Sequence, residues 1–188
     1  MSVVDCPVLV ADFGTSTSSG AVIGADGAIR MLKEPGSGSW SWPSAVAVHG
    51  EQLVVGTAAE RRKKAAPQAY RAEFKRDLGQ DLPIPLGDRS FAVTELIAAV
   101  LRVFGRQAAA LIGRNVQRVV LTVPASYGPD DPRRELMITA GERRPDSPRS
   151  SCCPNRLLPR TRQWPVNELP RTRSCWCTTS AAAPSMRP

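Results

Sequence analysis

The chain has 188 residues, which is enough for one ordinary domain or for one lobe of a larger one. Its net charge of +8 comes mostly from residues 143–188, which hold nine arginines, no lysine and only Asp146 and Glu168 as acids. The remaining 142 residues are almost neutral, so the charge does not indicate a dedicated nucleic-acid-binding domain. No apolar run reaches membrane-spanning length and no basic leader precedes an apolar segment. We therefore expect a cytoplasmic protein without a membrane partner.

The first expected elements are two short strands around a turn of small residues. Residues 8–11 are apolar and predict a buried strand, and residues 21–23 predict a second one. Between them, Gly14 lets the backbone approach a ligand closely, and the N–H groups and hydroxyls that follow can surround a phosphate. Asp12, at the end of the first strand, can hold Mg²⁺ through its water shell. The same residues also suit an ordinary β-hairpin with an Asp/Ser turn, and the local pattern leaves both interpretations open.

The next residues predict a β-hairpin, then a helix interrupted by a proline, and then a longer, regular helix. Residues 43–56 predict two strands of a β-hairpin, with His49, the single histidine, in the turn between them. Residues 58–72 suggest a helix that carries a solvated basic run and is interrupted by Pro67. Residues 93–112 place apolar side chains on one helical face, and we expect Thr94 to cap this helix. Gly113 is expected to end it.

The last expected elements before the tail are a strand and a helix. Residues 116–123 are rich in valine and leucine and predict a buried strand that stops at Pro124. The acids before Pro132 favour a helix start there, because acidic side chains stabilise the positive end of a helix dipole. The pattern as a whole predicts a mixed α/β protein.

Four segments, taken in this order, resemble the Hsp70 (DnaK-like) chaperones, in the first lobe of their ATPase domain. They are the turn at residues 12–18, the strands at 42–48 and 53–58, the Lys-Arg-x-x-Gly segment at 75–79, and the Thr-Val-Pro-Ala strand at 119–127. The turn alone also occurs in actins and sugar kinases, so a related actin-fold kinase or filament protein is the alternative. The segments at 75–79 and 123–125 disfavour that alternative.

The resemblance implies a fold, cofactors and partners. The fold would be a truncated first lobe of the actin/Hsp70-type ATPase, which is ribonuclease-H-like, over residues 1–142. The intact family binds ATP or ADP with Mg²⁺, and its ATPase drives binding of unfolded polypeptides with the help of co-chaperones.

The resemblance also implies roles for particular residues. The residues that would surround the β- and γ-phosphates are Gly14, Thr15 and Ser16. Asp12 would lie against the water shell of Mg²⁺. Lys75 would be catalytic, because it would orient the attacking water and balance charge on the γ-phosphate. Pro124 would couple nucleotide state to substrate binding in another domain.

Residues 143–188 change character and predict a disordered tail. They are rich in Arg, Pro and Ser and show no hydrophobic period, so ordering them costs more entropy than burial returns. Their four cysteines, at 152, 153, 175 and 177, fit no familiar zinc spacing. A tail with this charge is also compatible with nucleic-acid binding, which we regard as the weaker alternative.

The tail further reads as out-of-frame translation. Plausible GC-rich codons for residues 145–159, regrouped by one base, spell Ala-Gly-Phe-Ala-Ala-Val-Glu-Leu-Leu-Pro-Glu-Pro-Val-Ala-Ala, a family-like continuation. The same shift applied to residues 174–188 spells Val-Leu-Leu-Val-Tyr-Asp-Phe-Gly-Gly-Gly-Thr-Phe-Asp-Ala-Ala, which resembles the family's second phosphate motif. We therefore hypothesise a frameshift near residues 143–144. Without the second motif, we expect this chain to bind nucleotide weakly and to be catalytically inactive.

Overall fold

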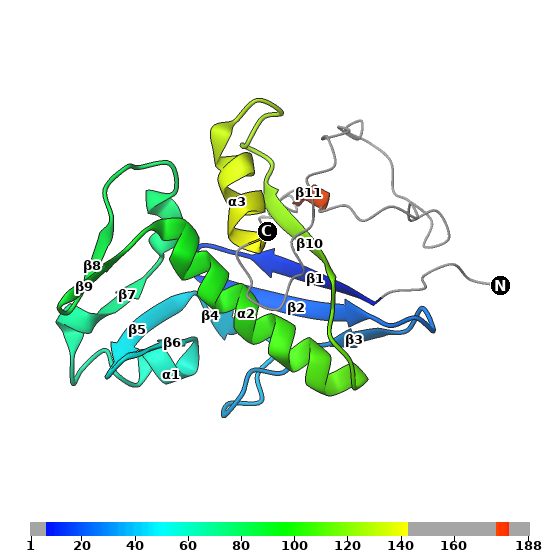
Figure 1. Cartoon of the computed structure of the whole chain (residues 1–188), viewed down its shortest axis with the longest axis horizontal. Helices are drawn as coiled ribbons and strands as arrows, with labels where there is room; N and C mark the ends of the chain where they lie inside the picture. The colour runs from blue at the N-terminus through cyan, green and yellow to red at the C-terminus, as the bar shows by residue number, and fades with distance from the viewer. Residues whose placement is uncertain (1–6, 143–175, 181–188) are drawn as a thin grey trace, which may run out of the picture.

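The computed structural model describes residues 7–142 and the backbone of residues 176–180. Within these residues, the largest sheet has the strand order β11-β10-β1-β2-β3, with β4 paired to β2 (Figure 1). Its strands are β1 (Val8–Phe13), β2 (Thr17–Ile23), β3 (Ile29–Met31), β4 (Trp42–Pro43), β10 (Arg118–Pro124) and β11 (Trp176–Ser180). β1, β10 and β11 run parallel to one another, whereas β2 pairs antiparallel with β1 and β3.

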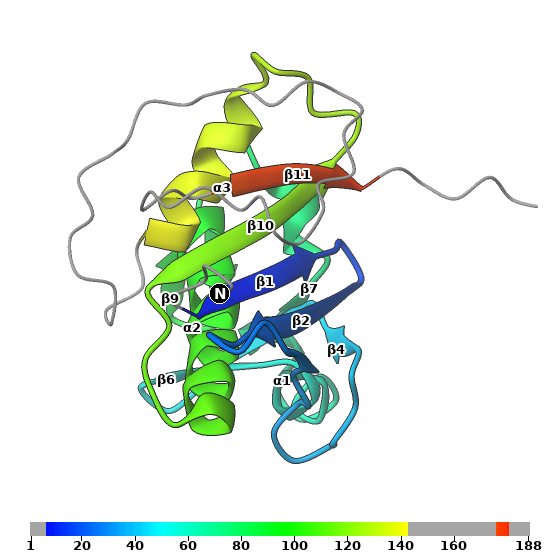
Figure 2. The same ribbon diagram turned by 90° about the vertical axis from the view of Figure 1, so that its right-hand side faces the viewer.

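Two helices cover one face of this sheet. Helix α2 (Val93–Ile112) packs against β1 and β2, and α3 (Pro132–Glu142) packs against α2 and β10. Figure 2 shows both helices behind the strands of the large sheet. The mixed α/β composition predicted from the sequence is confirmed.

The core lies between α2 and the sheet because strands and helix each turn one apolar face towards the other. On β1, Leu9, Ala11 and Phe13 alternate inward and are fully buried. Phe104 of α2 meets Trp42 of β4 edge to face, with ring centroids 4.3 Å apart. The Trp42 indole N–H also donates to the carbonyl of Leu32, so its one polar group is satisfied in the core.

A second, smaller group of elements lies beside the large sheet (Figure 1). Its three-stranded sheet has the order β6-β5-β7 and is followed by the hairpin β8–β9. The bounds of these strands and of the short helical segments are β5 (Ala45–His49), β6 (Gln52–Val55), α1 (Thr57–Glu60), η1 (Pro67–Ala69), β7 (Tyr70–Ala72), η2 (Phe74–Asp77), β8 (Ile84–Leu86) and β9 (Arg89–Phe91). The hairpin expected over residues 43–56 is confirmed as β5 and β6, with His49 exposed beside its turn.

The helix expected over residues 58–72 is wrong. Only Thr57–Glu60 form an α-helix, and Tyr70–Ala72 form β7, which pairs antiparallel with β5. Pro67 begins a 3₁₀ turn instead of interrupting a longer helix. The backbone of residues 70–72 gains its hydrogen bonds from the edge of β5, and this tertiary pairing outweighs the helical preference of the alanines and basic residues before it.

The long helix is predicted well except at its cap. Its bounds, Val93–Ile112, match the expectation, and Gly113 ends it in the left-handed conformation with φ 72°. The N-cap is Ala92, however, and the Glu95 carboxylate accepts a hydrogen bond from the Ala92 N–H. The expected cap at Thr94 is therefore wrong, because Glu95 satisfies the free backbone donor from within the first turn.

The tail is only partly described. Trp176–Ser180 form β11 and pair parallel with β10, from Val120–Trp176 to Pro124–Ser180. For these five residues the prediction of disorder is wrong, since the edge of β10 supplies backbone partners to a segment whose Trp and Thr residues suit a strand. The rest of the predicted tail, residues 143–175 and 181–188, lies outside the described residues, and the frameshift hypothesis stays a prediction.

Candidate functional site

The candidate site lies at the carboxyl ends of two neighbouring parallel strands, β1 and β10. Strand β1 ends at Phe13, and residues 14–16 turn the chain back into β2, so the expected phosphate turn is also the turn of a β-hairpin. The hairpin interpretation of these residues is therefore confirmed, and phosphate binding by the same turn stays a prediction. Ligands of parallel sheets commonly bind at this end of the strands.

Gly14 is required by the tightness of this turn. A Cβ atom added at Gly14 would lie 2.1 Å from the carbonyl oxygen of Thr17, far inside contact distance. Because Thr17 O belongs to the backbone, no side-chain movement can relieve this clash. The turn therefore has its present shape only with glycine at position 14.

Ser44 fixes the turn from the side of β5. Its hydroxyl donates to the carbonyl of Gly14 at 2.8 Å, and its N–H donates to the carbonyl of Ser16 at 2.9 Å. The same hydroxyl lies 2.7 Å from that of Ser18. Sequence reasoning assigned no role to Ser44, although it stands inside the Trp-Pro-Ser segment that carries the resemblance. With the two carbonyls held by Ser44, the N–H groups of the turn are presented on a rigid backbone.

Lys75 contacts the end of β1, immediately before the turn, from 62 residues away in the sequence. It lies on η2 with its side chain only 5% exposed, and its ammonium group donates to the carbonyl of Phe13. Phe74 anchors η2 by packing on the Phe13 ring, with centroids 5.8 Å apart. Burial lowers the pKa of Lys75, and the Asp12 carboxylate partly opposes this shift. The structure thus brings the expected catalytic lysine, Asp12 and the turn together.

Glu73 is a second polar contact of the turn that sequence reasoning missed. The Ser16 hydroxyl donates to its carboxylate at 3.2 Å, and Arg76 forms an ion pair with it at 3.0 Å. Glu73 has φ 54° and is the one non-glycine residue with positive φ in the described part of the chain. Such conformations cost energy and concentrate at functional sites, so this residue is a marker that only a structure can reveal.

Asp12 and Pro124 occupy the ends of the two parallel strands. The Asp12 side chain is exposed and accepts a hydrogen bond from the hydroxyl of Thr122 on β10. Pro124 ends β10, two residues beyond Thr122, and its carbonyl accepts from the Tyr127 N–H at 2.9 Å. All the residues expected at the site therefore lie on β1, β10, η2 or the turn between β1 and β2.

The arrangement suits a phosphate with Mg²⁺. Backbone N–H groups of the turn, small hydroxyls and one buried ammonium group attract an anion, and an exposed carboxylate at the strand end can bind waters of a Mg²⁺ shell. Within residues 7–142 and 176–180, no three His, Cys, Asp or Glu side chains cluster as a metal site of their own. Among the same residues, no helix is long and apolar enough to span a membrane.

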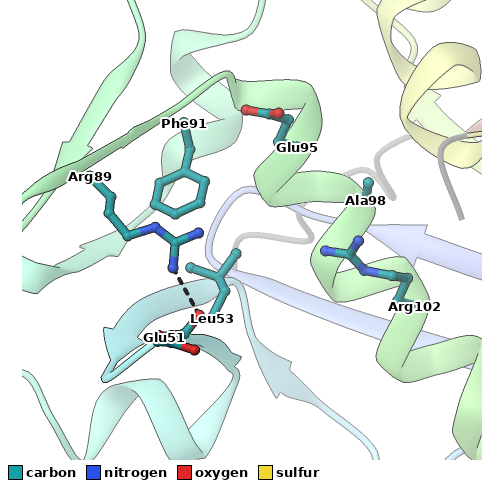
Figure 3. A pocket seen from close by; sticks show the side chains of 7 residues that line it. All are labelled: Glu51, Leu53, Arg89, Phe91, Glu95, Ala98 and Arg102. Carbon is teal, nitrogen blue, oxygen red and sulfur yellow. Dashed lines mark hydrogen bonds between the residues drawn. The ribbon is translucent and has the colours of Figure 1, made fainter. Parts of the chain in front are cut away.

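A separate pocket of about 490 Å³ lies between β6, β9 and the first turns of α2 (Figure 3). Arg89 stacks over Phe91 and donates to the carbonyl of Glu51 at 2.9 Å, while Leu53 forms part of the wall. The residues that line this pocket include neither the turn at residues 14–16 nor Asp12 or Lys75. The pocket and the candidate phosphate site are therefore distinct.

Three relatives with the name chaperone protein DnaK are similar to this chain. The protein from Halobacterium salinarum is 34% identical over 137 residues, that from Mesomycoplasma hyopneumoniae 33% over 135, and that from Elusimicrobium minutum 33% over 133. These matches cover 72%, 72% and 69% of the chain but only 21%, 22% and 21% of the relatives. The chain thus spans about a fifth of the length of the curated relatives it matches. No family model matches it. The chain belongs to the Hsp70 (DnaK) family and corresponds to an N-terminal part of the proteins in it.

Proposed function

We propose that the turn at residues 14–16 binds the phosphates of ATP or ADP together with Mg²⁺, as part of an Hsp70-type ATPase lobe. The observation that carries this proposal is the position of Lys75, a buried ammonium group held on the carbonyl of Phe13 immediately before the turn. A buried charge is costly to retain for stability alone, and an anion beside it offsets that cost.

The residues would share the work as follows. The N–H groups of Gly14, Thr15 and Ser16 would hold the phosphate oxygens, and the Ser16 hydroxyl would exchange its bond to Glu73 for one to phosphate. Lys75 would orient a water molecule and stabilise negative charge. Asp12 would hold waters of the Mg²⁺ shell, and the metal would neutralise phosphate charge when bound.

We also propose that this lobe has a ribonuclease-H-like fold. The large sheet is consistent with the ribonuclease-H-like core of this lobe, since three antiparallel strands are followed in sequence by parallel strands on the other side of β1. In an intact protein of this family, we propose ATP-driven binding of unfolded polypeptides, with co-chaperones as partners, Pro124 as the coupling residue and the cytoplasm as the location. The kinase, filament and nucleic-acid alternatives receive no support from the relatives.

For the 188-residue chain by itself, we propose weak nucleotide binding without turnover. Its described residues supply one phosphate turn, and both affinity and catalysis in this reaction class depend on a closed site that orients the nucleotide from several sides.

Substitution of Gly14 tests the proposal directly. We expect Gly14→Ala to abolish Mg²⁺-dependent binding of a fluorescent ADP analogue, because its Cβ would collide with the carbonyl of Thr17. Gly128→Ala is the matched control: a Cβ at Gly128 meets no atom within 4 Å, so the wild-type affinity should remain. Equal binding by both variants and the wild type would place the nucleotide elsewhere.

A further inference from the structure

Asp12 and Thr122 are neighbours because of the register between β1 and β10. The two strands pair Val10 with Val120 and Ala11 with Leu121, so the next parallel pair is Asp12 with Thr122. Side chains alternate along both strands, and Ala11 and Leu121 are fully buried on the face that α2 covers. Asp12 and Thr122 therefore share the opposite face, at the carboxyl end of both strands.

A hydrogen bond joins these two side chains. The Thr122 hydroxyl donates to Oδ1 of Asp12. In the described residues, this is the one hydrogen bond that the Asp12 carboxylate accepts, so its second oxygen, Oδ2, is left to a ligand or to solvent. An aspartate side chain rotates broadly about its terminal bond, and a hydroxyl that holds one oxygen removes much of this freedom.

We propose that Thr122 is a positioning residue for Mg²⁺: its hydroxyl holds Oδ1 of Asp12 so that Oδ2 can accept hydrogen bonds from the water shell of the ion. This inference rests on the proposed nucleotide site. Mg²⁺ requires near-octahedral geometry and keeps its waters, so a carboxylate that contacts the shell must be fixed in orientation. Groups that orient such contacts typically change metal affinity by about 10- to 100-fold when they are removed.

Threonine suits this task better than its isosteres. Its β-branched shape fits a strand position as valine does, so the packing of β10 does not itself require a hydroxyl. The hydroxyl is uncharged, so it can hold the carboxylate without competing with Mg²⁺ for its charge. Thr122→Val therefore removes the hydrogen bond while it retains the strand, and Thr122→Ser retains the hydrogen bond while it removes a methyl group.

The test measures ADP binding to the full chain by calorimetry, once with excess Mg²⁺ and once with EDTA. For the wild type, we expect tighter binding with Mg²⁺. For Thr122→Val, we expect this Mg²⁺-dependent gain to fall by about 10-fold, with the affinity in EDTA unchanged. Thr122→Ser should restore the gain. Thr94→Val, which removes a hydroxyl from α2, should behave as the wild type, and thermal unfolding will establish that each variant is folded.

Three results would overturn the inference. The first is a full Mg²⁺-dependent gain in Thr122→Val, or in Thr122→Ala if the valine variant does not fold. The second is an equal loss of ADP affinity with and without Mg²⁺, because this would indicate a general structural role. The third is absence of ADP binding by the wild type, which would overturn the proposed function as well, whereas the first two would leave that function standing.

Discussion

Lys75 illustrates how a functional residue opposes stability at the scale of a single side chain. Its ammonium group is buried and donates a hydrogen bond to the carbonyl of Phe13. Burial lowers the pKa of this group. An apolar side chain of similar volume would avoid the desolvation cost. The retention of lysine here is understandable if an anion binds beside it.

We predict that Lys75→Met stabilises the folded chain at neutral pH and weakens nucleotide binding. The gain in unfolding free energy should be on the order of 1 kcal/mol, because the variant removes a buried charge. Since folding lowers the Lys75 pKa, the folded state binds the proton less well than the unfolded one. The destabilisation is therefore present at low pH and disappears as the pH rises towards the ordinary lysine value of 10.5.

Urea unfolding across this pH range checks the prediction. The difference in unfolding free energy between Lys75→Met and the wild type should shrink as the pH increases. Lys64→Met, at an exposed position, should change stability by less than about 0.5 kcal/mol at any pH. A variant that is less stable at neutral pH, or a difference that does not depend on pH, would contradict this account of Lys75.

At the scale of elements, the sequence predicts those segments whose local pattern and tertiary contacts agree. Residues 93–112 carry both a helical apolar face and a terminal glycine, and α2 has the expected bounds. Residues 70–72 lack any strand pattern of their own and become β7 because β5 offers an edge. The same reason explains β11, which pairs with β10 although its surroundings in the sequence are rich in arginine and proline.

The residues of the candidate site also fall into those that the sequence indicates and those that only the structure reveals. Asp12, Gly14 and Ser16 could be proposed from the sequence because they lie within one five-residue segment, and Lys75 because of the family resemblance. Glu73, Ser44 and Thr122 could not, since the contacts of Glu73 and Ser44 with the turn, and of Thr122 with Asp12, depend on backbone conformation and strand register across long separations in the chain.

The buried carboxylate of Glu34 joins the loop between β3 and β4 to the start of α1. Glu34 is 4% exposed and accepts hydrogen bonds from the N–H of Thr57 at 2.5 Å, from its hydroxyl at 2.6 Å and from the Ser37 hydroxyl at 2.5 Å. We predict that Glu34→Ala lowers the unfolding free energy by about 2–3 kcal/mol, because three donors lose a charged acceptor.

The natural control for this change is Glu51→Ala. Glu51 is exposed in the turn between β5 and β6, so its removal should cost less than about 0.5 kcal/mol in the same urea titration. Similar losses for the two variants would mean that the Glu34 hydrogen bonds do not secure the start of α1.

At the scale of the whole molecule, the frameshift hypothesis makes a prediction about the gene. Correction of one insertion or deletion near the codons for residues 143–144 should restore an in-frame Ala-Gly-Phe and, later, Asp-Phe-Gly-Gly-Gly-Thr. Sequencing across the codons for residues 140–188 and beyond checks this. If no reading frame contains the second motif, residues 143–188 are a basic tail in their own right, and salt-dependent nucleic-acid binding becomes the question to ask of them.

The central claim is that the turn after β1, together with Lys75, forms a nucleotide phosphate site. A residue-resolved titration of the ¹⁵N-labelled chain with ADP and Mg²⁺ tests it most directly. We predict saturable shifts of the Gly14, Thr15 and Ser16 amides, with smaller shifts around Lys75 and Thr122, and no change around the separate pocket at Arg89. Shifts confined to that pocket, or no shifts at the highest soluble ADP concentration, would contradict the claim.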